Sequence, residues 1–192
     1  MKFSHFILMF ALCLSCFSCA KKPEKPIVQS PGMVTYEKFA ISVSPNHWTP
    51  IVDDSFTQMK KLQNDANAKL PLSFMINTSY QGKNSELMHI GHLETKEGKV
   101  PSIQNINDYF LFLYEKVKDT NQAVMDTGKQ DKLQYWVIRI KMPEFYSIKL
   151  VYYFDKSTKP LFIDFYVSTQ AFTELVSIEF DKLISSISVI NQ

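Results

Sequence analysis

The chain has 192 residues, of which 45% are hydrophobic and 14% aromatic, and its 21 basic and 19 acidic side chains give a formal net charge of +2. This composition is typical of one globular domain and excludes an intrinsically disordered chain, which would be less hydrophobic and more highly charged. Because the charge is nearly neutral and Arg139 is the single arginine, no nucleic acid partner is expected. The five glycines form no phosphate-binding loop motif, so no cofactor is expected.

The first part of the chain has the order of a secretory signal peptide. Lys2 carries a positive charge, an apolar run follows at residues 3–14, and small residues and cysteines come directly after it. The run is shorter than the roughly 20 apolar residues that span a bilayer. We therefore expect residues 1–18 to be a signal peptide and the protein to be exported.

All three cysteines, Cys13, Cys16 and Cys19, lie in or just after this segment. A domain without further cysteines must be held together by its core rather than by disulfides. The sequence LSCFSCAKKP resembles a bacterial lipobox, which implies diacylglycerol on a cysteine thiol and cleavage just before that residue. We expect lipidation of Cys19, because polar sequence begins directly after it. Cys16 is the alternative, and a plain signal peptide with incidental cysteines is a third interpretation.

Residues 19–33 are predicted to be the lipidated cysteine and a tether. Between residues 20 and 33 there are three prolines, four charged residues and no periodic apolar positions. Proline keeps such a segment extended, so it can hold a domain away from a lipid surface. The expected location is a bacterial membrane, on the periplasmic side or at the cell surface, and residues 34–192 are expected to form a single domain.

From residue 34 the apolar pattern changes between the periods of strands and helices. We expect strands at 34–43, 72–80, 86–95, 133–142, 148–155 and 161–167, a short strand at 123–126, and helices at 56–70, 102–117 and 172–189. Residues 81–84 predict a hairpin, and the short links between the last three strands favour an antiparallel meander. The fold class is therefore α+β, with a mostly antiparallel sheet of about six strands sandwiched by helices.

Two segments resemble a known family. The sequence YEKFAISVSPNHW at 36–48, a strand entering a Pro-x-x-Trp turn, is similar to the start of PsbP-like and Mog1-like domains and of related bacterial lipoproteins. Residues 135–187, from YWVIRIKMPEF to SSI, resemble the three antiparallel strands and C-terminal helix that end these domains. The resemblance implies a PsbP/Mog1-like fold over residues 34–190 and an accessory or assembly role. It supplies no catalytic residue.

His89 and His92, in the sequence MHIGH, are candidate metal ligands, because imidazole is the commonest metal ligand. Residues three apart in a strand point to opposite faces, so the pair closes on one ion only with a bulge at Gly91. Such a site would also need His47 or a nearby carboxylate. We therefore expect no metal site.

The other candidates for catalysis have structural interpretations. Asp53 and Asp54 could act as an acid–base pair, but their position before a helix favours capping. Asp164 is expected to be a turn or edge residue. Ser185 and Ser186 lack the G-x-S-x-G sequence of a nucleophile elbow. We therefore expect the protein not to be an enzyme.

Aromatic residues are expected on both faces of the sheet. Trp136 is placed in the core, and Tyr135, Tyr146 and Tyr153 are placed on the opposite face. Either a second helix layer covers that face, or its tyrosines form a patch for a protein or ligand.

The predicted partner-binding surface lies in the loops around His47 and Trp48 and from Tyr80 to Asn84, since these carry bulky or polar groups outside the apolar stripes. Trp48 has an equal alternative as a core residue that plugs the end of the sheet. The function predicted from the sequence is a lipid-anchored, non-enzymatic accessory or assembly module that binds an envelope protein. The alternative is a small-ligand or metal carrier that uses a cleft between a helix layer and the sheet, near Trp48 or the histidines.

Overall fold

The computed structural model describes residues 32–52, 71–119 and 122–190, and these contain two antiparallel sheets and two helices. The large sheet has the strand order β3-β4-β5-β9-β8-β7-β6. Its strands are β3 (Trp48–Pro50), β4 (Ser73–Gly82), β5 (Leu87–Glu94), β6 (Gln122–Gln130), β7 (Leu133–Lys141), β8 (Phe145–Tyr153) and β9 (Leu161–Ser168). The small sheet has the order β1-β2-β10, with β1 (Met33–Tyr36), β2 (Phe39–Ser42) and β10 (Ser188–Val189).

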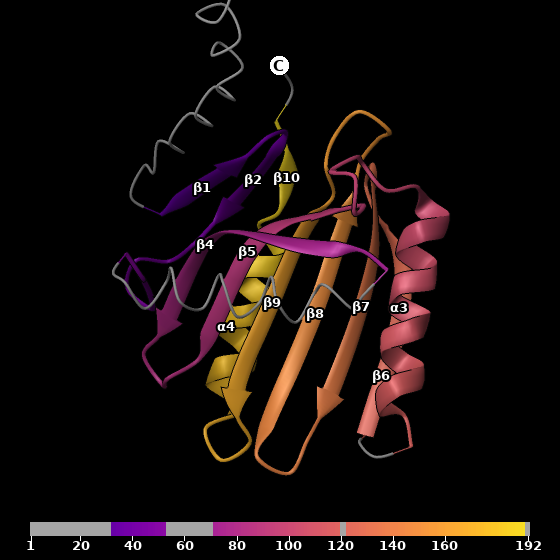
Figure 1. Cartoon of the computed structure of the whole chain (residues 1–192). Helices are drawn as coiled ribbons and strands as arrows, with labels where there is room; N and C mark the ends of the chain where they lie inside the picture. Colours follow the sequence, from indigo (N-terminus) through magenta and orange to yellow (C-terminus); the bar gives the residue numbers. More distant parts are fainter. Residues whose placement is uncertain (1–31, 53–70, 120–121, 191–192) are drawn as a thin grey trace, which may run out of the picture.

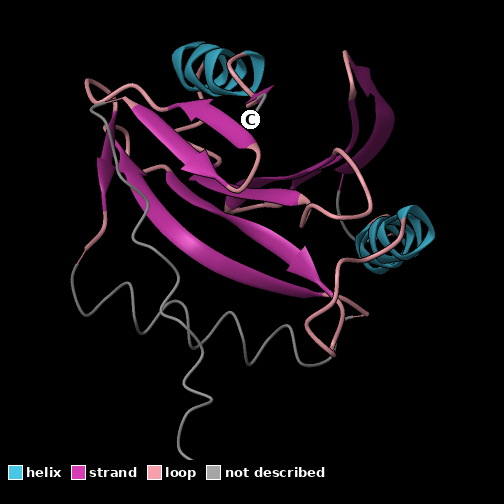
Figure 2. Ribbon diagram, turned by 90° about the horizontal axis from the view of Figure 1, so that it is seen from above, coloured by secondary structure: helices cyan, strands magenta, loops and turns pink. Residues whose placement is uncertain are grey.

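One helix lies on each face of the large sheet (Figures 1 and 2). Helix α3 (Ile103–Val117) packs on β6 and β7, and helix α4 (Glu174–Ser185) lies on the other face together with the small sheet. Each face has its own apolar core, with Trp136 on the α3 side and Phe180 on the α4 side. The predicted α+β class and mostly antiparallel sheet are confirmed, with seven strands in the large sheet rather than about six.

Helix α3 begins where its sequence predicts. The Ser102 hydroxyl accepts a hydrogen bond from the Asn105 amide, and the Asn105 side chain accepts one from the Ser102 amide, so the two residues form a capping box. Ile106, Tyr109 and Phe110 are buried against the sheet. The apolar stripe expected for this helix therefore contains the residues that pack against the sheet.

The first predicted strand, at 34–43, is wrong as a single element. The chain turns at Glu37, which has a φ of 46°, and forms an antiparallel hairpin of β1 and β2 with Tyr36 opposite Phe39. Both of these side chains are buried. Because the apolar alternation continues across this two-residue turn, the two strands look like a single strand in the sequence.

Two further boundaries differ from the prediction. The last helix ends at Ser185 instead of continuing to residue 189, and Ser188 and Val189 pair with β2. The Ser186 hydroxyl accepts the Ser42 amide and donates to the Leu183 carbonyl, so it ends the helix at the edge of the small sheet. The strand expected at 123–126 extends over the nine residues of β6.

Strands β4 and β5 form the predicted hairpin, with a change of register between Ile76 and Thr78. The bulge lies in β4, not at Gly91 as a shared histidine site would need. A Cβ atom at Gly91 would overlap the Met75 carbonyl oxygen, so only glycine fits this close approach of the two strands.

The predicted signal peptide at 1–18, with Cys16 and Cys19, most of the tether, the helix expected at 56–70, and Asp53 and Asp54 lie outside the described residues. Among the residues that are described, no helix has both the length and the apolar character needed to cross a membrane.

Candidate functional site

The two candidate histidines lie on opposite faces of β5, as strand alternation predicts. His92 contacts Tyr36 of the small sheet, on the α4 side. His89 shares its face with Gly91, which lies against Phe74 in the α3-side core. In the three described ranges, no group of three histidine, cysteine or carboxylate side chains is arranged to hold a metal ion.

His92 belongs to a polar cluster between the two sheets. Its Nδ1 lies 2.6 Å from the Tyr36 hydroxyl and 3.1 Å from Asn77 Oδ1. Its Nε2 lies 3.1 Å from Lys159 Nζ and 3.4 Å from Glu94 Oε2, and Lys159 also donates to Glu94. The imidazole therefore connects β1 to the bulge of β4 and to the loop that precedes β9.

His89 is buried on the other face. Its Nδ1 lies 2.6 Å from the Ser79 hydroxyl, and its ring meets the Tyr166 ring edge to face with centroids 6.2 Å apart. Burial lowers the pKa of His89, an effect that the nearby Asp164 carboxylate opposes and Lys149 reinforces. This histidine is therefore favoured in its neutral form.

Beside His89, the buried Asp164 carboxylate forms an ion pair with the partly buried Lys149. The Asp164 side chain is fully buried, and Lys149 Nζ donates to its two oxygens at 2.7 and 2.8 Å. The Tyr166 hydroxyl donates to the same carboxylate at 2.6 Å and accepts from Lys149 at 2.9 Å. Burial together with this carboxylate raises the pKa of Tyr166. The charges thus satisfy one another, which is the arrangement of a structural ion pair.

Asp164 was expected at a turn or edge and instead lies in the middle of β9. The sequence contained a signal for this pair. In LFIDFYV, Asp164 lies two residues after Phe162, and in SIKLVYY, Lys149 lies two residues before Val151. Both charged residues therefore share a face of the sheet with apolar side chains of the α3-side core. Ser147, on the same face of β8, has the one buried side-chain polar atom without a hydrogen-bond partner among the described residues.

Two residues of the predicted partner surface, Trp48 and Tyr80, are buried, whereas Gln81, Lys83 and Asn84 are exposed. Trp48 is 3% exposed and packs edge-on against Phe165, and Tyr80 is 4% exposed, so the structure places Trp48 in its core alternative. His47 Nε2 lies 3.1 Å from Glu86 Oε1, and this buried carboxylate also accepts the Asn84 amide. His47, Trp48 and Tyr80 therefore close one end of the sheet, and a partner role for this end stays a prediction.

The aromatic residues of the second face are mostly covered. Tyr146 stacks on Phe172 with ring centroids 4.2 Å apart, and Tyr135 and Tyr152 pack on the core beneath α4. The placement of Tyr153 with Tyr135 was wrong. Trp136 pairs with Val151, so Tyr153 lies on the Trp136 side of the sheet.

Helix α4 leaves a cleft of about 200 Å³ over β6, β7 and β8. Its walls are the side chains of Asp126, Gln130, Tyr135, Val137, Arg139, Leu150, Tyr152, Phe180, Asp181 and Ile184. The Tyr152 hydroxyl donates to Gln130 Oε1 at 2.8 Å, and burial raises the pKa of Tyr152 to about 12. Gly128 makes room for Tyr135, because a Cβ at Gly128 would lie 2.6 Å from the Tyr135 hydroxyl. Of these residues, the sequence pointed to Tyr135, as part of a possible tyrosine patch, and did not identify the set as a site.

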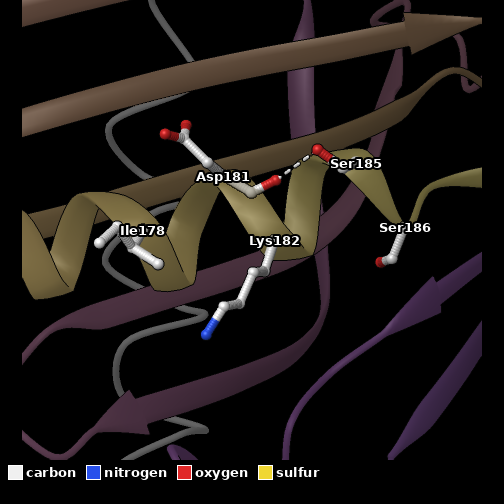
Figure 3. A pocket seen from close by; sticks show the side chains of 5 residues that line it. All are labelled: Ile178, Asp181, Lys182, Ser185 and Ser186. Carbon is white, nitrogen blue, oxygen red and sulfur yellow. Dashed lines mark hydrogen bonds between the residues drawn. The ribbon is translucent and has the colours of Figure 1, made fainter.

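A second hollow is open and lies along α4 itself. It is lined by Ile178, Asp181, Lys182, Ser185 and Ser186 (Figure 3). Asp181 and Lys182 point away from each other, and the Ser185 hydroxyl donates to the Asp181 carbonyl of its own helix. No set of side chains converges there, so the cleft under α4 is the better candidate site.

No protein-family model matches the chain, and no curated protein matches it.

Proposed function

We propose that this protein is a lipid-anchored lipoprotein of the bacterial cell envelope, and that it acts as a non-enzymatic accessory or assembly module that binds a partner protein. The order of charge, apolar run and Cys19 at the start of the chain supports the anchor. The α+β architecture is compatible with a PsbP/Mog1-like domain, and the resemblance of residues 36–48 and 135–187 supports that assignment.

The observation that carries the protein-binding role is the free edge of β6. This strand has nine residues and pairs only with β7 among the described strands. Several of its side chains are exposed, including the apolar Val124 at 61%. An extended segment of an envelope protein can add to such an edge through main-chain hydrogen bonds. We therefore propose β-strand addition to β6 as the mode of binding.

The anchor is tested by fractionation of cells that produce the full chain. Cys19→Ser is expected to move the protein from the membrane fraction to the soluble exported fraction, because the acyl chains supply the membrane affinity. Cys16→Ser is the matched control and is expected to leave the protein membrane-bound. Mass spectrometry of the mature N-terminus identifies the acylated residue. An unmodified N-terminus, or acylation of Cys16, contradicts the assignment.

The binding edge is tested with a charge on β6. Val124→Lys puts a charge on the face of the edge strand, beside the side chains of an added strand, and is expected to reduce capture of the partner from detergent-solubilised envelope strongly, because charged side chains on an edge oppose strand addition. Val52 is 87% exposed and lies in another part of the chain, so Val52→Lys is the control that retains capture. Capture that is equal for both variants, or absent from the unaltered protein, overturns strand addition at β6.

A second function, that of a small-ligand carrier, is favoured by the cleft under α4. This cleft lies between a helix and the sheet, although away from Trp48 and the histidines. It combines an apolar floor with charged side chains at its rim. Thermal shifts against a panel of metabolites, compared between the unaltered protein and Arg139→Gln, test this function.

A further inference from the structure

We propose that the cleft under α4 binds a free amino acid with a basic side chain. Its carboxylate would bind to Arg139, and its two ammonium groups would bind to Asp126 and Asp181. This inference rests on the second proposed function, the carrier, and is independent of the lipid anchor and of β6.

The first argument is that three charged side chains line the cleft without neutralising one another. In the described part of the chain, Arg139 and Asp181 form no side-chain hydrogen bond and no salt bridge, and all three charged side chains are exposed. Asp126 accepts only the amide of the next residue, Thr127. These groups can therefore still receive a ligand.

The register of the strands explains how the opposite charges come together. Val124 pairs with Arg139 and Asp126 pairs with Val137, so Asp126 and Arg139 are diagonal neighbours on the α4 side of the sheet. Diagonal neighbours in an antiparallel pair are about 7–8 Å apart. Asp181 reaches the same cleft from α4. A ligand that carries both signs of charge can bridge such a gap.

The second argument is size and polarity. A volume of about 200 Å³ is below the roughly 300–1,000 Å³ of pockets that hold drug-sized molecules, so the ligand should be small. Val137, Leu150, Phe180 and Ile184 give the cleft apolar walls on which an alkyl chain can pack. An amino acid with a straight alkyl side chain meets both conditions.

The third argument is the balance of charge. Two carboxylates and one guanidinium line the cleft, which gives it a formal charge of −1. A dibasic amino acid carries one carboxylate and two ammonium groups, so it complements each of these charges. A neutral side chain would leave one aspartate unpaired, and an acidic side chain would add repulsion. The expected order of affinity is lysine, then leucine, then glutamate.

The test is calorimetric titration of the full chain with L-lysine, L-leucine and L-glutamate. We expect lysine to bind at least about tenfold more tightly than leucine, and glutamate not to bind. Arg139→Gln and Asp181→Asn are each expected to weaken lysine binding at least about tenfold, since each removes a charge-assisted hydrogen bond. Lys129, on the opposite face of β6, gives the control Lys129→Gln, which should bind lysine normally.

Equal binding of the three amino acids, no binding, or binding that Arg139→Gln and Asp181→Asn leave unchanged overturns the inference. Asp126→Asn is a third variant in case one of the others alters folding, which unfolding curves will reveal. A ligand of another class, such as glucose or palmitic acid, whose binding is lost in Arg139→Gln would refute the amino acid and retain the carrier. If no compound of the whole panel bound, the proposed carrier function would be refuted as well.

Discussion

The Tyr36 hydroxyl lies 2.6 Å from His92 Nδ1, and the two rings stack with centroids 5.3 Å apart. This contact joins β1 of the small sheet to β5 of the large sheet. The turn between β1 and β2 is also attached to the loop before β9, since the Lys159 amide donates to Glu37 and Lys38 pairs with Asp155. Polar contacts therefore supplement the apolar core in holding the two sheets together.

Tyr36→Phe removes the hydroxyl and keeps the ring. We expect the free energy of unfolding to fall by about 1–3 kcal/mol, because a buried imidazole nitrogen loses a hydrogen-bond partner. Chemical denaturation measures this loss. Tyr114→Phe is the matched control, because the Tyr114 hydroxyl forms no hydrogen bond with another described residue. Equal stability of the two variants would show that the Tyr36 hydroxyl contributes nothing to the connection.

Asp164→Asn leaves the mostly buried Lys149 ammonium without its counter-charge. The expected loss is about 3–5 kcal/mol of unfolding free energy, the range for breaking one side of a buried ion pair. Glu115→Gln is the control at the exposed pair with Lys118 and should cost far less. Combining Asp164→Asn with Lys149→Met should recover much of the loss, because no buried charge is then left. If the double variant were less stable than Asp164→Asn alone, the ion pair would not be the cause.

The lowered pKa of His89 predicts how stability depends on pH. Its ordinary value of 6.5 applies to the unfolded chain, whereas burial favours the neutral imidazole in the folded protein. The contribution of His89 is therefore complete above about pH 6.5 and is lost as the pH falls toward the lower folded pKa. We expect the unfolding free energy of His89→Gln to fall less between pH 7 and pH 5 than that of the unaltered protein. Parallel curves for the two proteins would contradict this.

Trp136 is fully buried, and its Nε1 donates to Asn107 Oδ1 at 2.5 Å. Trp136→Ala should cost about 3–5 kcal/mol, since it leaves a cavity between the sheet and α3. Trp136→Phe should cost less, because the ring still fills much of that space. Thermal unfolding ranks the variants, and a loss below about 1 kcal/mol for Trp136→Ala would mean that the core collapses to fill the space.

The sequence predicted the elements whose boundaries have local chemical causes. The β4–β5 hairpin has its turn residues, and α3 has Ser102 as a cap and a regular apolar stripe. The errors arise where tertiary contacts decide. Ile187 continues the helical spacing of α4, but the Ser186 contact with Ser42 ends that helix.

The candidate sites were predictable only in part. Strand alternation gave the opposite faces of His89 and His92, which the structure confirms. The cleft under α4 depends on bringing residues of β6, β7 and β8 beneath one helix. Their separation in the chain leaves no local spacing that marks them as a set. The exposure of Trp48 likewise depends on Phe165, which lies far along the chain.

Strand β10 pairs with β2 through Ser188 opposite Ala40, so the small sheet joins two ends of the described chain. During synthesis, Phe39 and Ile41 would therefore emerge long before the strand that completes their sheet. Contacts between such distant residues form slowly, because a long loop must close first. Until then β2 would present an unpaired edge, to which a chaperone or a second nascent chain could bind.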